Sequence, residues 1–461
     1  MAKQRDSEIL TQVGPGTPMG GLMRQFWIPG LKSSELVADG DPVRCMLLGE
    51  KLIAFRDSSG RVGVMDHRCP HRCASLFFGR NEEDGIRCVY HGWKFDVEGN
   101  CLDMANVPPA QDFKHKVRAK AYKAEERNGV VWVFMGDQDA VPELPHIAAA
   151  MLPEIEANSF FVMRNCNWLQ PMEGDIDTSH LNFLHMGSMG RVDFEKDDPT
   201  QFGAVHKDPE YFTTDTDCGT MYAAYRPAGE GEIYWRFAHF MFPCWALAPF
   251  KAFKSYAIAR AWVPLDDEHT MFIMMGAKEG PNETSDFDHH LPNTTDFLGR
   301  WRCDQTFAND YMMDRDLQRK SSFTGIEGIH QQDQAVTESM GSTTDHSWEH
   351  LAPSDQMITA TRKRLLNAAK AYQKDGSLPA SAADPALYRE QRGGFFVGTE
   401  FTLGANLTGQ PPHSRVIEQA RFDDSLEDID QEVVSPHVSQ FVCQDGLNLI
   451  GRQTTQNTGR H

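Results

Sequence analysis

The sequence lacks any long apolar run. No stretch of about 18 apolar residues occurs in the chain, so we expect no membrane-spanning helix. The first residues, from Met1 to Ser7, also lack the apolar core of a secretory signal. Both absences predict a cytoplasmic protein without a membrane partner.

Cysteine and positive charge are scarce as well. The ten cysteines among 461 residues show no spacing typical of a disulfide framework, which agrees with a reducing compartment. Lysine and arginine total 45 against 65 acidic residues, which gives a net charge of −20. This balance disfavours nucleic acid and anionic membranes as partners. It is compatible with a basic redox partner, and simple solvation of the surface explains it equally well.

The sequence contains no G-x-G-x-x-G segment after a predicted strand. That motif binds the pyrophosphate of dinucleotides, so we expect flavin and nicotinamide cofactors to be bound by another protein. The length of 461 residues and the hydrophobic content of 40% predict two or three ordinary globular domains.

Two short stretches carry most of the functional information. The first reads Cys-Pro-His and contains Cys69 and His71, and the second reads Cys-Val-Tyr-His-Gly-Trp and contains Cys88 and His91. Two thiolates on one iron and two imidazoles on the other form a Rieske [2Fe–2S] cluster, with a potential of roughly −150 to +300 mV. The pattern predicts a cluster that receives electrons from a reductase and passes them to a stronger oxidant, such as O₂ at a second iron.

A zinc site is the alternative interpretation, because two cysteines and two histidines also bind zinc. Zinc knuckles usually place cysteine close to cysteine and histidine close to histidine. Here each stretch supplies one cysteine and one histidine, which suits two irons side by side. Cys73 follows His71 by two residues, and we interpret it as a small buried residue rather than a fifth ligand.

A second informative stretch, 167–185, contains D-x-x-H-x₄-H, formed by Asp177, His180 and His185. Two histidines and a carboxylate on one face of Fe(II) leave positions open for O₂ and substrate. At about 3.6 residues per turn, a regular helix would separate the two histidines around its axis. The helix must therefore bend, end or bulge between them if both bind one metal. The alternative is a set of polar residues on a surface helix, and the upstream Rieske motif favours the metal.

Together these motifs resemble the catalytic α subunit of Rieske non-haem iron oxygenases, in the branch that includes phthalate dioxygenase and aryl-ether O-demethylases. The likeness runs from Gly-Pro-Gly-Thr-Pro at 14–18 to the segment 332–341, Gln-Asp-Gln-Ala-Val-Thr-Glu-Ser-Met-Gly. It implies an α+β fold, with an N-terminal all-β Rieske domain and a C-terminal helix-grip catalytic domain that combines an antiparallel sheet with helices.

The resemblance also implies ligand sets for two metal centres. The [2Fe–2S] cluster would be bound by Cys69, His71, Cys88 and His91. The mononuclear Fe(II) would be bound by His180, His185 and a carboxylate far downstream, which matches Asp333 in the segment 332–341.

Asp177 matches the family's bridging carboxylate, which is not a ligand. It would accept hydrogen bonds from His180 and from the partner subunit's His91, and so orient both rings. Within one subunit of this family the two metal centres are too far apart for fast electron transfer. The resemblance therefore implies a homo-oligomer, either a trimer or stacked trimers.

The implied function is that of a terminal oxygenase component, which hydroxylates a small aromatic substrate with O₂ as co-substrate. The outcome would be ring dihydroxylation, or O-demethylation of a methoxylated aromatic acid. Electrons would come from NAD(P)H only through a separate reductase, with or without a ferredoxin.

A Rieske electron-transfer protein without oxygenase activity is the alternative function. Respiratory-type carriers add a cysteine to each ligand loop, and the loop 88–93 has no second cysteine. A pure carrier would also need no large additional domain.

The expected organisation is an N-terminal arm at 1–40, the Rieske domain at 41–155, the catalytic domain at 156–405 and a C-terminal extension at 406–461 with a partly disordered tail. Expected strands are 43–50, 51–55, 129–134, 255–263 and 270–275. An amphipathic helix is expected over 354–374, with Ser354 as N-cap and Gly376 as its stop.

Apolar residues between 235 and 245 are candidate walls of a substrate pocket, and an ordinary β-rich core explains them equally well. They are Trp235, Phe237, Phe240, Met241, Phe242 and Trp245. Arg226, Arg236 and Lys207 are candidates to bind a substrate carboxylate, although basic residues in strands and loops are usually solvated.

Overall fold

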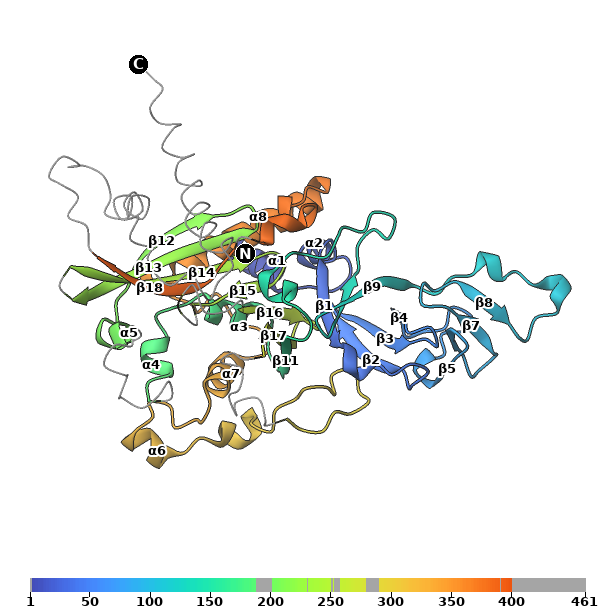
Figure 1. Cartoon of the computed structure of the whole chain (residues 1–461), viewed down its shortest axis with the longest axis horizontal. Coiled ribbons are helices and arrows are strands. Elements are labelled where there is room, and N and C mark those ends of the chain that lie inside the picture. The colour runs from blue at the N-terminus through green and yellow to red at the C-terminus, as the bar shows by residue number, and fades with distance from the viewer. Residues whose placement is uncertain are drawn as a thin grey trace, which may run out of the picture.

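The computed structural model describes residues 2–187, 201–229, 231–249, 252, 258–278, 290–389 and 391–399. The expected extension 406–461 and the beginning of the expected strand 255–263 lie outside the described residues. The described part is elongated, with two small sheets at one end and a large sheet with helices at the other (Figure 1). No helix in the described ranges has the length and apolar character needed to cross a bilayer.

The two small sheets are antiparallel and lie within residues 27–134. One has the order β1-β10-β9-β4-β3-β2 and the other the order β5-β6-β7-β8. The strands of the first are β1 (Trp27–Lys32), β2 (Val43–Leu47), β3 (Glu50–Arg56), β4 (Val62–Asp66), β9 (Ala121–Arg127) and β10 (Val130–Phe134). Those of the second are β5 (Arg80–Glu82), β6 (Gly85–Arg87), β7 (Trp93–Phe95) and β8 (Cys101–Met104).

Branched and aromatic side chains explain why these segments form strands. Every residue of β10 is buried, and the strand pairs with β1 on one side and β9 on the other. Such residues fit a pleated surface that is covered on both faces. A separate apolar core lies under β5 to β8 and includes Cys69, Cys88 and Trp93, so the two loops at 69–71 and 88–93 are anchored on a packed base.

The large sheet is also antiparallel. Its order is β11-β17-β16-β15-β14-β13-β12, and β18 pairs with the part of β14 that β15 leaves open. Its strands are β11 (Ala157–Arg164), β12 (Glu210–Asp215), β13 (Gly219–Gly229), β14 (Glu232–Met241), β15 (Trp245–Leu247), β16 (Ile258–Pro264), β17 (Thr270–Ala277) and β18 (Gly394–Thr399).

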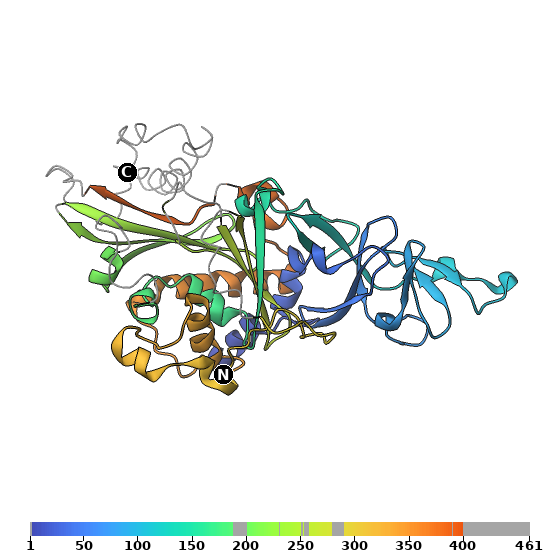
Figure 2. The same ribbon diagram turned by 60° about the horizontal axis from the view of Figure 1, so that its bottom comes forward.

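Helices gather against one face of this sheet, as Figure 2 shows. This is the helix-grip arrangement expected for the C-terminal part. The helices are α1 (Ala2–Thr11), α2 (Pro18–Met23), α3 (Leu169–Asp175), α4 (Leu181–Leu184), α5 (Gln201–Val205), α6 (Arg315–Lys320), α7 (Ile329–Ser339) and α8 (Gln356–Asp375).

Helix α8 is the amphipathic helix expected at 354–374. It buries Met357, Leu365 and residues between and beyond them at helical spacing. Gly376 ends it in the left-handed conformation, with φ of 77°. The prediction of Ser354 as N-cap is wrong, because a 3-10 turn over Pro353–Asp355 precedes the helix and places Asp355 at the N-cap position.

Residues 1–40 contribute both to the part with the small sheets and to the part with the large sheet. Helices α1 and α2 pack against α8, whereas β1 is an edge strand of the first small sheet. The boundaries expected from the sequence remain a prediction, and the structure adds that this first segment connects the two parts.

Candidate metal centres

The first candidate centre is formed by two loops with the same backbone hydrogen bonds. The amide of Cys69 donates to Ala74 and its carbonyl accepts from residue 73, at 2.8 and 2.9 Å. The amide of Cys88 donates to Trp93 and its carbonyl accepts from residue 92, at the same two distances. The two loops thus make the same turn around their cysteines, which suits a site built from two similar halves.

The side chains of these loops meet at the tip of the small sheets. The rings of His71 and His91 lie 4.4 Å apart between centroids. Cys69 and Cys88 are both buried, and burial, followed by the neighbouring Cys88 thiol, raises the pKa of Cys69 to about 12. Two buried cysteines side by side would be held as thiolates only with a cation between them.

The donor set fits a Rieske cluster. His91 Nδ1 is buried without a hydrogen-bond partner among the described residues, and such an atom calls for a ligand. Trp93 stacks on the His71 ring at 4.3 Å and 11°. Cys73 was expected to be buried, and this is wrong: it is exposed, with φ of 60°, because its amide closes the first loop.

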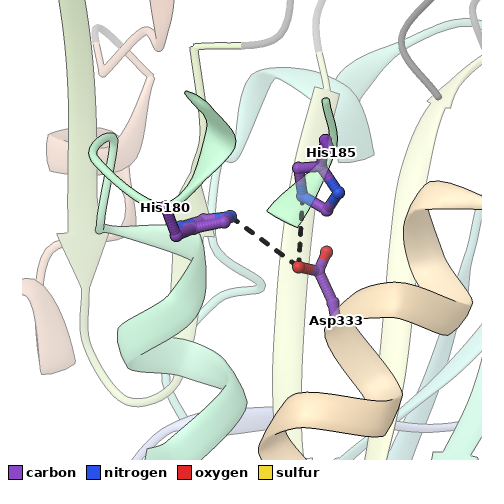
Figure 3. A group of neighbouring side chains, drawn as sticks. All are labelled: His180, His185 and Asp333. Carbon is purple, nitrogen blue, oxygen red and sulfur yellow. Dashed lines mark ion pairs between the residues drawn. The ribbon is translucent and has the colours of Figure 1, made fainter. Parts of the chain in front are cut away.

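The second candidate centre brings together His180, His185 and Asp333 (Figure 3). One ligand atom from each lies within 4.8 Å of the others. Asp333 Oδ1 is 3.3 Å from His185 Nε2 and 3.7 Å from His180 Nε2. Two imidazole nitrogens and a carboxylate converging in this way fit a facial triad for ferrous iron.

A break in the helix places the two histidines. Helix α3 ends at Asp175, and α4 is a one-turn helix with His180 just before it and His185 just after it. Helix α4 therefore ends at Leu184, just before His185, and an end of the helix was one of the options that the five-residue spacing required. Asp333 comes from α7, on the opposite side of the site.

Charges within the site favour an ionised carboxylate. Burial alone would raise the pKa of Asp333, but the imidazoles of His185 and His180 hold it far below its ordinary value. Burial likewise opposes protonation of His180, and the carboxylates of Asp177 and Asp333 raise the pKa of its ring. A metal cation bound between these residues would replace the proton on the His180 ring.

Asp177 contacts His180 from outside the triad. Its Oδ2 is 3.4 Å from His180 Nδ1, and its Oδ1 accepts bonds from the amide and hydroxyl of Ser179 at 2.7 and 2.6 Å. Burial would raise the pKa of Asp177, but these bonds lower it overall. The structure thus shows the contact with His180, and the contact with a second subunit remains a prediction.

Two buried partners of the site were missed in the sequence. Gln332 Oε1 accepts from His185 Nδ1 at 2.8 Å, while its amide donates to the carbonyl of Ile326 at 2.7 Å. Asp175 pairs with Arg260 and accepts from the indole of Trp262. Gln332 stands beside Asp333 in the quoted segment, but only the fold shows that it reaches His185.

The residues that line the cavity beside the second centre are mostly not the apolar residues between 235 and 245. A cavity of about 710 Å³ beside His180 is lined by Ser179, Phe183 and Lys207, among others. Phe240, Met241, Phe242 and Trp245 belong to the main core, as the simpler interpretation predicted. For Arg226 and Arg236, two of the candidates to bind a substrate carboxylate, the alternative of a solvated side chain is wrong, because their exposed fractions are 1% and 9%.

Comparisons with known proteins agree with these two centres. A family model described as Rieske [2Fe–2S] domain matches residues 26–117, and one described as LigXa C-terminal domain like matches residues 133–391. The sequence is 49% identical over 413 residues to the oxygenase subunit of 3-chlorobenzoate-3,4-dioxygenase from Comamonas testosteroni, covering 86% of this chain and 95% of that protein.

Other relatives are more distant. The oxygenase subunit of phthalate 4,5-dioxygenase from Pseudomonas putida is 37% identical, covering 81% of this chain and 87% of that protein. The oxygenase subunit of 5,5'-dehydrodivanillate O-demethylase from Sphingobium sp. is 30% identical, covering 84% and 85%. Solved NdmA from Pseudomonas putida shares the fold, with a TM-score of 0.53 at 18% identity, covering 84% of this chain and 99% of that one.

The matched domains and relatives exclude a simple electron carrier, because the second domain matches along most of its length. The chain therefore belongs to the Rieske-type aromatic oxygenases, as an oxygenase subunit whose cofactors are a Rieske [2Fe–2S] cluster and a mononuclear iron.

Proposed function

We propose that this oxygenase acts on an aromatic carboxylic acid and adds both oxygen atoms of O₂ to its ring. The balanced reaction consumes the arene, O₂, two electrons and two protons and gives a cis-diol. The observation that carries the substrate class is a pair of buried arginines, Arg226 and Arg236, beside the iron site. Relatives named for 3-chlorobenzoate and phthalate support a carboxylate substrate.

The two arginines project from one face of the large sheet. Arg226 pairs with Tyr234 across the strands, and Arg236 pairs with Ala224 two positions along, so all four share a face. Arg226 donates to the carbonyl of Thr178 at 3.3 Å. Because Thr178 lies between Asp177 and the His180 ligand, this face is turned toward the iron site.

No carboxylate neutralises either arginine among the described residues. Their partners there are neutral: Arg226 donates to the carbonyls of His206 and Thr178, and Arg236 to the Tyr234 hydroxyl and the Pro249 carbonyl. Burial, and then the nearby Arg236, lower the pKa of Arg226. Arg226 Nη1 and Arg236 Nε are buried without a partner among the described residues. Two buried cations with free donors fit an anionic ligand.

The residue roles follow from the same geometry. We propose Cys69, His71, Cys88 and His91 as cluster ligands and His180, His185 and Asp333 as iron ligands. When bound, the two centres supply O₂ activation and the stored electron for it. The protein holds the iron site open, excludes bulk water around it and orients the acid through its carboxylate.

Electrons would reach the cluster from a separate reductase, with or without a ferredoxin. We further propose a trimer, or stacked trimers, in which the partner subunit's His91 meets Asp177. The exposed position of the loop at 88–93, where Tyr90 is 55% exposed, supports a contact of this kind.

The test of the substrate class is a screen of aromatic acids with chemically reduced protein. Benzoates, phthalates and methoxybenzoates are supplied with O₂, and diol, formaldehyde and O₂ uptake are scored. We expect a diol from an acid and none from the corresponding methyl ester. Formaldehyde as the main product would show O-demethylation instead, and equal turnover of acid and ester would contradict the carboxylate site.

Arg226→Gln and Arg236→Gln should each weaken the acid's binding by about 10- to 100-fold, since a charge-assisted hydrogen bond contributes about 1.5–3 kcal/mol. Binding of the neutral methyl ester should change little. The measurement is substrate affinity by titration of the resting protein. Arg364→Gln, on α8, where the guanidinium donates to the carbonyl of Thr216 at 3.3 Å, is the matched control. An equal loss for acid and ester would assign the two arginines to the fold alone.

His91→Ala should remove the brown colour and the labile sulfide while the large sheet stays folded. The substitution deletes one of four ligands, and a cluster with an open position is lost. Visible absorption, sulfide content and circular dichroism check this. His115→Ala, in an exposed 3-10 turn of the same domain, should keep the spectrum. A coloured His91→Ala protein would contradict the assignment.

Gln332→Leu should weaken metal binding at the mononuclear site by about 10- to 100-fold, the usual effect of removing a hydrogen-bond partner of a ligating histidine. Gln332 holds the proton on His185 Nδ1 and so leaves Nε2 free for the metal. Titration of the iron-depleted site with Co²⁺ measures the affinity and the ligand-field spectrum. Gln332→Glu keeps the acceptor and should restore most of the affinity. Unchanged binding by Gln332→Leu would remove this role.

A further inference from the structure

A basic segment lies next to the Rieske centre on a chain that is otherwise strongly acidic. Between β8 and β9, residues 105–118 contain Lys114, Lys116 and Arg118 but only one acidic residue, Asp112. All four are exposed. Asp112 lies 3.7 Å from Lys114, and no ion pair among the described residues neutralises Lys116 or Arg118. The segment thus carries a local positive charge, in contrast to the net charge of −20.

This segment is connected to a proposed cluster ligand by two contacts between aromatic rings. Phe113, 40% exposed, meets the edge of the buried Trp93 ring at 5.9 Å. Trp93 in turn stacks on His71 at 4.3 Å, and its indole nitrogen is fixed by Asn106 at 2.8 Å. A continuous contact therefore runs from a solvent-exposed ring to a cluster ligand.

The segment also stands free of the rest of the molecule. It lies at the tip of the small sheets, at the end furthest from the large sheet (Figure 1, cyan). Its 3-10 turn at Lys114–Lys116 packs mainly on β8 of the same domain. A protein partner can approach it from solvent without meeting the large domain.

We propose that the surface formed by Phe113, Lys114, Lys116 and Arg118 is the docking site for an acidic electron-donor protein. The positive patch on a negative molecule would attract such a donor while the remaining surface repels it, so the donor arrives in one orientation. One electron then passes from the donor, which is oxidised, to the cluster, whose ferric pair becomes ferric–ferrous. The proposal rests on the oxygenase function and adds the location and charge of its redox partner.

The test uses an acidic plant-type [2Fe–2S] ferredoxin as the donor probe. Stopped-flow absorbance follows reduction of the Rieske cluster in the wild-type protein and in Lys114→Glu/Lys116→Glu. We expect reduction at low ionic strength to be at least about tenfold slower in the variant, and the salt dependence seen with the wild type to disappear. Reduction by dithionite should be the same in both. Binding of the oxidised ferredoxin, measured by calorimetry, should weaken in parallel.

Lys363→Glu/Lys374→Glu is the matched control, because it makes the same charge change on exposed positions of α8. It should alter the rate by less than about twofold. Phe113→Leu keeps the charges and should lower the limiting rate at saturating ferredoxin.

Equal slowing by both charge reversals would mean a general charge effect and would overturn the proposal. Loss of the oligomer in the first variant would also overturn it and assign the surface to contacts between copies. Failure of the acid screen, which needs no donor protein, would leave these results unaffected.

Discussion

Asp333→Ala is expected to abolish hydroxylation while leaving the Rieske spectrum unchanged. Asp333 would be the only negatively charged ligand of the proposed iron. Burial would raise the pKa of its carboxyl, but the imidazoles of His185 and His180 lower it and so favour the ionised form. Without it, two neutral imidazoles would have to hold a dication alone. Loss of the ion removes several kcal/mol of stabilisation, so product formation should fall by at least about 1,000-fold.

Two measurements check this expectation. Iron content should fall from three to two atoms per chain, and a single turnover with chemically reduced protein should give no product. Asp316→Ala, on an exposed position of α6 where the carboxylate pairs with Arg319, should match the wild type in both. Three retained irons with normal turnover would contradict the assignment of Asp333, and loss of colour would show that the two centres are not independent.

The sequence alone pointed to the candidate ligands that are close together along the chain. Cys69 and His71 lie on one loop and Cys88 and His91 on another, and a ligand motif of this length is readable because the chemistry constrains the spacing. The same is true of His180 and His185, which flank a single helical turn. The strand and helix types were predictable where apolar residues repeat regularly, as in β10 and α8.

The distant parts of the site required the fold or a family resemblance. His185 and Gln332 are 147 residues apart, and nothing in the local pattern links them. Asp333 was one aspartate among many until a resemblance selected it. The pairing of Asp175 with Arg260 likewise depends on α3 packing beside β16.

The buried arginines show a different limit of sequence reasoning. In a strand, an arginine is expected to point to solvent, because burial of an unpaired charge is costly. Arg226 and Arg236 are buried nevertheless, and neutral carbonyl and hydroxyl groups satisfy only part of their donors. Residues that break a local rule of this kind are the ones to examine for function.

Asp177→Asn should leave both metal centres filled and yet slow reoxidation of the reduced cluster by orders of magnitude in a single turnover with substrate and O₂. The substitution is conservative for the fold. The amide oxygen of asparagine can still accept the two bonds from Ser179 that close the local turn. What is lost is the charge and the second acceptor, which faces His180 at 3.4 Å. If Asp177 were a surface residue with no further role, the substitution would change the free energy of unfolding by only about half a kcal/mol and would not affect reoxidation of the cluster.

Two further experiments separate the role of Asp177 from a local structural effect. Ser179→Ala removes the hydroxyl bond but leaves the carboxylate facing His180, and it should reoxidise its cluster nearly as fast as the wild type. If Asp177 acts across a subunit boundary, mixing Asp177→Asn subunits with His91→Ala subunits should restore turnover at those boundaries where an intact cluster meets an intact carboxylate. If Asp177 acts only within its own subunit, mixing should restore no turnover. Each chain would then lack either its Rieske cluster or the Asp177 carboxylate. Reoxidation of Asp177→Asn at the wild-type rate would show that this carboxylate is not on the route at all.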